Sequence, residues 1–115
     1  MKSLRFTVFA LFFFFLFTAM SWAHPPKEVL PSWDGKGNLK VEIVHNVENP
    51  QKHYVNHVNI YLNGKLIQQK DYTQQSTNNS ETLTFSLGNL PSGSTIKVEA
   101  TCVIFGTTSG SLVIP

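Results

Sequence analysis

The chain has 115 residues, a formal net charge of +2 and a single cysteine. The excess charge comes from Lys2 and Arg5, which precede a long apolar run; beyond them seven lysines balance seven acidic residues. This near-neutral balance does not predict nucleic-acid binding, and one cysteine excludes both an internal disulfide and a zinc site closed by several cysteines.

The first 23 residues have the pattern of a secretory signal peptide. Apolar side chains fill most of 6–20, and Ser21 and Ala23 place small residues where a signal peptidase requires them. The run is shorter than the roughly 20 apolar residues that a transmembrane helix needs. We therefore expect 1–23 to be removed and 24–115 to form one periplasmic or secreted domain, with no membrane contact after cleavage.

The rest of the chain is patterned as an all-β domain. Alternating apolar residues predict strands at 39–45, 53–62, 65–72, 81–87, 95–105 and 109–115. Asn63-Gly64 predicts a tight hairpin between the second and third of these. Pro25, Pro26 and Pro31 indicate an extended lead-in that does not pair as a central strand. Five or six short strands without a helical period predict a single antiparallel β-sandwich.

Histidine and cysteine side chains are the candidate ligands of this chain. His45 ends one predicted strand and His53 begins the next, so the corner between them can bring two imidazoles to one point. His57 would lie roughly 13 Å from His53 along a straight strand, so one ion takes only one of the two unless the strand begins after His53. Cys102 shares the apolar face of its strand, a position that also suits a buried thiol with no metal.

Two segments together carry a resemblance to a known family. HNVENPQKHYVNHVNIYLNGKLI at 45–67, followed by IKVEATCVIFG at 96–106, resembles the iron domain of superoxide reductases (neelaredoxin and the C-terminal part of desulfoferrodoxin). The resemblance spans roughly 24–106, with the motifs in the same order. It implies a seven-stranded immunoglobulin-like sandwich, a non-haem iron held by histidines and an axial cysteine thiolate, and reduction of superoxide to hydrogen peroxide. The matching metal ligands here are His24, His45, His53 and Cys102, with His57 as a reserve.

The chain departs from the family pattern at three places, one of which is a longer loop between His45 and His53 that lacks the family's proline after the first histidine. Phe105 occupies the position of the family's last ligand histidine, and a phenyl ring cannot bind the metal. The family's Glu-Lys pair before the early histidine is replaced by Trp22-Ala23. Because that lysine is thought to attract superoxide and help to protonate the product, the resemblance implies metal binding more directly than turnover. The expected partners are superoxide or a small redox partner.

Two alternative functions remain open. Cleavage after Ala23 gives His24 a free α-amino group, and an amine and an imidazole from one residue can chelate Cu(II) together. The first alternative is therefore a periplasmic protein that handles copper or another metal through His24. The second is a metal-free immunoglobulin-like interaction module, with Cys102 and Phe105 in its core.

Overall fold

The computed structural model describes residues 24–115, and the predicted signal peptide lies outside the described residues. The described chain forms seven strands: β1 Glu28–Trp33, β2 Asn38–Val44, β3 Val55–Leu62, β4 Lys65–Asp71, β5 Ser80–Ser86, β6 Thr95–Cys102 and β7 Thr107–Val113. Within 24–115 there is no helix with the length and apolar character needed to cross a membrane.

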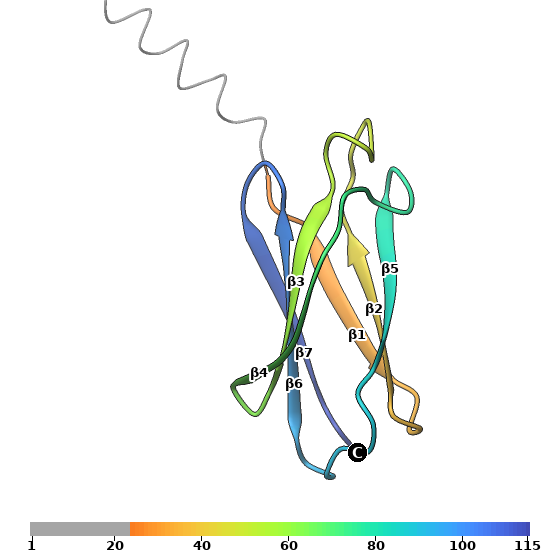
Figure 1. Cartoon of the computed structure of the whole chain (residues 1–115), viewed down its shortest axis with the longest axis vertical. Helices are drawn as coiled ribbons and strands as arrows, with labels where there is room; N and C mark the ends of the chain where they lie inside the picture. Colours follow the sequence, from red (N-terminus) through yellow and green to blue (C-terminus); the bar gives the residue numbers. More distant parts are fainter. Residues whose placement is uncertain (1–23) are drawn as a thin grey trace, which may run out of the picture.

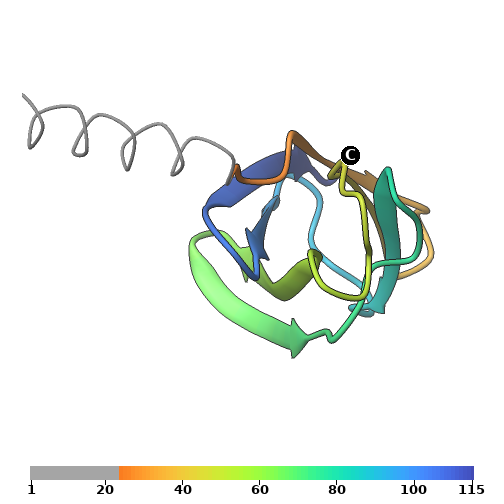
Figure 2. The same cartoon turned by 90° about the horizontal axis from the view of Figure 1, so that it is seen from above.

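The strands build two antiparallel sheets that pack face to face (Figures 1 and 2). One sheet has the order β1-β2-β5 and the other has the order β4-β3-β6-β7. Relative to an immunoglobulin constant domain, the fourth strand pairs with β3 instead of lying beside β5. The predicted fold, an all-β, immunoglobulin-like antiparallel sandwich, is confirmed.

The core lies between the central strands of the two sheets. Alternate residues of these strands are fully buried: Leu39, Val41 and Ile43 from β2, and Ile96, Val98 and Ala100 from β6. Full burial of a Val, Leu or Ile side chain stabilises a fold by about 1.5–3 kcal/mol. The alternation of apolar residues in the sequence therefore identifies the face of each sheet that is turned to the core.

The N-terminal lead-in contains a strand that the apolar pattern did not predict. This strand, β1, pairs only with β2, and the edge position tolerates Pro31 because its missing N–H is not needed by a second neighbour. The edge of β1 that does not pair with β2 lies close to β7: a Cβ on Gly110 would lie 1.9 Å from the carbonyl oxygen of Val29. Only glycine fits at that contact, which closes one side of the sandwich.

Four chain segments meet at the end of the sandwich opposite the C-terminus (Figure 1). They are the lead-in, the β2–β3 loop, the β4–β5 loop and the β6–β7 turn. The lead-in is fixed there because Thr108 donates a hydrogen bond to the Pro26 carbonyl at 2.5 Å. Gly106 of the turn also packs on Pro25, so closely that a Cβ at Gly106 would lie 2.7 Å from that proline's Cβ. These contacts place His24 over the end of the sandwich.

Candidate metal centre

Four predicted ligands lie at this end of the molecule. The ligand atoms of His45, His53 and Cys102 all lie within 4.8 Å of one another, and His53 Nε2 is 3.1 Å from Cys102 Sγ. The ring of His24 lies beside them, with its centroid 5.9 Å from that of His45 and 5.7 Å from that of His53. We call these four residues the histidine–cysteine cluster. It draws on the lead-in, the two ends of the β2–β3 loop and the end of β6.

The β2–β3 loop folds back so that its two histidines converge. His45 follows the last residue of β2, and its backbone N–H donates to the Asn79 carbonyl at 2.9 Å. At the other end, Asn49 organises a turn: its side-chain oxygen accepts from the Gln51 N–H, and its carbonyl accepts from the His53 N–H. Because β3 begins only at Val55, His53 stays in the loop and is free to face His45.

His45 is the most deeply buried residue of the cluster. Its side chain is fully buried, and its Nδ1 lies 2.7 Å from Oε1 of Gln75. Its other ring nitrogen, Nε2, is buried and has no hydrogen-bond partner among residues 24–115. Leaving a buried polar atom unpaired costs about 1–3 kcal/mol. A metal ion is a partner that would satisfy this atom.

The environment favours neutral imidazoles in the cluster. Burial lowers the pKa of His45, partly opposed by its hydrogen bond with Gln75, and the nearby His24 lowers it further. Burial is also the main cause that lowers the pKa of His53, followed by the other two rings. Neutral imidazole is the form that binds metal ions, so the site favours the protonation state that ligation requires.

Cys102 ends β6 with its side chain turned inward. The residue is only 4% exposed, and its sulfur lies 3.4 Å from the backbone nitrogen of Ile104, which donates to it. The predicted strand at 95–105 is shorter in the structure, because the chain turns after Cys102. Phe105 lies in that turn and is 59% exposed. The alternative that places Cys102 and Phe105 together in the core is therefore wrong for Phe105.

His57, the reserve ligand, is not part of the cluster. It lies on β3, where its Nδ1 is 2.5 Å from an Asp71 carboxylate oxygen and its Nε2 is 2.7 Å from the side-chain oxygen of Asn59. The hydrogen bond with Asp71 is the main cause that raises the pKa of His57. Both of its ring nitrogens are thus engaged by the protein itself.

A cavity of about 380 Å³ adjoins the cluster. It is lined by His24, His53 and the loop residues 46–49. A small molecule can therefore approach the two outer rings from solvent. Among the lining residues Glu48 carries the only carboxylate, and neither lysine nor arginine is present.

Two residues at these sites gave no signal in the sequence. Gln75 belongs to a polar loop, and nothing in that loop indicates that it contacts His45. Asp71 ends β4, and its contact with His57 depends on the pairing of β3 with β4. Comparisons with protein-family models, curated proteins and solved structures gave no match to this chain.

Proposed function

We propose that this protein binds one redox-active transition-metal ion in the histidine–cysteine cluster, and that the ion is iron used to reduce superoxide. The observation that supports it most directly is the buried, unpartnered Nε2 of His45, next to a second imidazole and a thiol. An apolar residue at this position would avoid the cost of burying that atom. The cost is offset if the atom binds an ion.

The close approach of an imidazole and a thiol supports a metal ion in the cluster. Metal ions bind imidazole nitrogen at about 2.1 Å and thiolate sulfur at about 2.3 Å, so two such donors on one ion lie within roughly 4.4 Å of each other. His53 Nε2 and Cys102 Sγ are 3.1 Å apart, so these two side chains could hold one ion together. The choice of iron comes from the resemblance to superoxide reductases.

The residues have separable roles in this proposal. Cys102 would bind as the thiolate, since a coordinating thiol is deprotonated. His45 and His53 would hold the ion from inside, and the exposed His24 would close the solvent side, next to the cavity through which superoxide arrives. Iron bound here would supply the one electron that, with two protons, converts superoxide to hydrogen peroxide, and a redox partner would then return that electron.

Copper is the second candidate, and the position of His24 favours it. His24 is the residue that the predicted signal cleavage makes the first of the exported chain, and its ring already lies beside His45 and His53. Its α-amino group would then add a nitrogen that suits Cu(II). Thiolate and imidazole ligands also suit copper redox sites.

The first test is metal binding by the exported protein. Anaerobic titration with Fe(II) should give one ion per chain, and oxidation should produce a thiolate-to-iron charge-transfer band. Cys102→Ser should remove that band, and Val103→Ser, a change at the exposed neighbour, should leave it intact. No bound metal, or a band that persists without Cys102, contradicts the proposal.

The second test is turnover. Iron-loaded protein with a reductant should consume superoxide and form one hydrogen peroxide for each superoxide, without releasing oxygen. Oxygen release would indicate dismutation instead. Stoichiometric iron without any consumption of superoxide would restrict the function to metal binding. A higher affinity for Cu(II) than for iron would favour the copper candidate.

A further inference from the structure

Within residues 24–115, Gln75 is the one side chain outside the cluster that hydrogen-bonds to a histidine ring of the cluster. It is 4% exposed, and all of its side-chain hydrogen bonds go to His45 or to its own loop. We infer that Gln75 is a positioning residue that holds His45 in the tautomer with the proton on Nδ1, so that Nε2 carries the free lone pair. That this lone pair then binds a metal rests on the proposed function.

The orientation of the Gln75 amide is determined by its surroundings. The nitrogen Nε2 of Gln75 donates to two backbone carbonyls, that of His45 at 2.7 Å and that of Thr77 at 2.9 Å. A reversed amide would place its oxygen against both carbonyl oxygens, with no hydrogen between them. Oxygen and nitrogen of a glutamine side chain are assigned from such networks, and this network allows one assignment.

The tautomer of His45 follows from that orientation. The oxygen Oε1 of Gln75 lies 2.7 Å from His45 Nδ1 and can only accept, so Nδ1 must carry the proton. A neutral imidazole has one N–H, which leaves Nε2 with a lone pair and no proton. This nitrogen is buried and has no hydrogen-bond partner in the described chain. Second partners of this kind commonly set the tautomer and ring angle of a metal-binding histidine.

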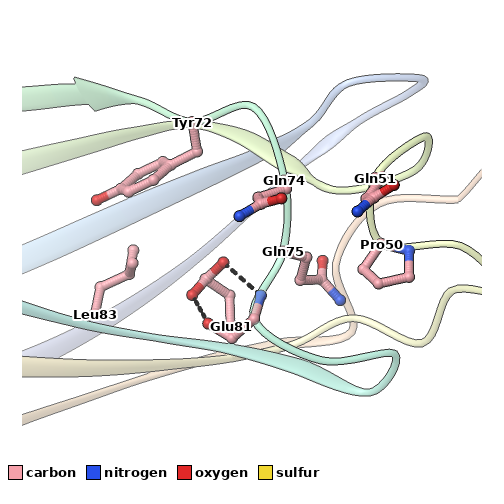
Figure 3. A pocket seen from close by; sticks show the side chains of 8 residues that line it. Pro50, Gln51, Tyr72, Gln74, Gln75, Glu81 and Leu83 are labelled. Carbon is pink, nitrogen blue, oxygen red and sulfur yellow. Dashed lines mark hydrogen bonds between the residues drawn. The ribbon is translucent and has the colours of Figure 1, made fainter.

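Neighbouring contacts hold the loop of Gln75 in place; Figure 3 shows Gln75 with the nearby Pro50, and its dashed lines are the hydrogen bonds of Glu81. Its backbone N–H donates to the Pro50 carbonyl at 2.9 Å, which ties its loop to the β2–β3 loop that carries His45 and His53. On the other side the buried carboxylate of Glu81 accepts from both the backbone and the hydroxyl of Ser76. The glutamine is therefore preorganised by two loops before any ion binds.

The experiment is a measurement of tautomers in metal-free protein. Only four histidines are present, so ring nitrogens labelled with ¹⁵N give a simple long-range correlation spectrum that shows which nitrogen of each ring bears a proton. His45 should be entirely protonated on Nδ1. In Gln75→Leu, Nδ1 loses the acceptor that favours a proton on it, so a population with Nε2–H should appear.

Gln74→Leu is the matched control, because Gln74 is exposed, precedes Gln75 and lines the same pocket as Gln75. Its His45 signals should equal those of the unmodified protein. Two outcomes overturn the inference: a proton on Nε2 of His45 in the unmodified protein, or an unchanged tautomer in folded Gln75→Leu. The first needs no variant, so the inference can fail even if Gln75→Leu does not fold.

A metal titration separates this inference from the proposed function. Loss of an outer partner typically lowers metal affinity about 10–100-fold, and we expect a loss in that range for Gln75→Leu with the thiolate band retained. If the unmodified protein binds no metal but shows the expected tautomers, the proposed function fails and the role of Gln75 stands. If Gln75→Leu shifts the tautomer without changing metal affinity, His45 Nε2 is not the ligand atom.

Discussion

The histidine–cysteine cluster and the His57–Asp71 pair show what distinguishes a candidate ligand from a structural histidine. His53 and His57 are neighbours in the sequence, at the entrance of β3 and within it. In the cluster the histidine rings lie beside one another and beside a thiol, and one buried ring nitrogen of His45 has no hydrogen-bond partner in the described chain. In His57, by contrast, one ring nitrogen contacts a carboxylate and the other contacts an amide oxygen. The residue type is the same, and the difference lies in whether the protein itself satisfies the ring.

The largest expected effect tests this comparison directly. His53→Ala removes a proposed ligand and should lower iron affinity by more than about 100-fold, since loss of an outer partner alone costs roughly 10–100-fold. His57→Ala should change it less than about twofold. Competition with a chelator of known affinity measures both. Equal losses in the two variants would show that the difference between the two histidines has no functional meaning.

A smaller expected effect, at the N-terminal His24, distinguishes copper from iron. One glycine added before His24 moves the α-amino group away from the imidazole of that residue. If copper is held by both groups of His24, Cu(II) affinity should fall roughly tenfold or more, in line with or above the loss of an outer partner. Iron held by the ring alone should be affected little. Titration calorimetry with each metal on the same variant decides between these expectations, and unchanged Cu(II) affinity would exclude the chelate at His24.

The two regions should also respond in opposite ways to pH. Burial lowers the pKa of His45 and His53 from 6.5, so metal-free protein should lose stability as pH falls from about 6.5 through their folded-state values. Asp71 raises the pKa of His57, so His57 stabilises the fold below its unfolded value, and this contribution disappears as pH rises through the folded value.

Urea unfolding of metal-free protein at several pH values measures these contributions. Stability should fall between pH 7 and pH 5, and it should fall more steeply in His57→Gln, which lacks the opposing contribution. Bound metal should reduce this loss of stability until the pH is low enough for protons to displace the metal from the histidines. Stability that rises on acidification would contradict the buried, neutral state of the cluster.

Much of the fold was predictable from sequence because burial on one face imposes a period of two. That period located β2 and β6 to within a few residues. It missed β1, where Pro31 interrupts the pattern at a position that only an edge strand tolerates. It also could not show the β-bulge between Val55 and His57, which lets both Val55 and Val58 be buried.

The candidate site was predictable in part. The corner between His45 and His53 is visible in the sequence because both lie next to a loop, and the structure brings them together with Cys102. Gln75 was not predictable, since its position depends on how a polar loop of 73–80 crosses to the β2–β3 loop. Ligands leave a pattern of residue types, whereas the residues that orient them are set by loop geometry that no periodicity encodes.

The smallest expected effect comes from the pair formed by His57 on β3 and Asp71 on β4. Asp71→Asn removes the carboxylate beside His57, and Asp71 is 85% exposed, so solvent screens most of the interaction. Stability at pH 5.5 should fall by less than about 1 kcal/mol, and the loss should shrink at higher pH as His57 gives up its proton. The pKa of His57, followed by NMR, should fall in the variant, while iron affinity stays constant. A large loss of stability at high pH would mean that the pair acts through packing, and a change in iron affinity would mean that the two regions are coupled.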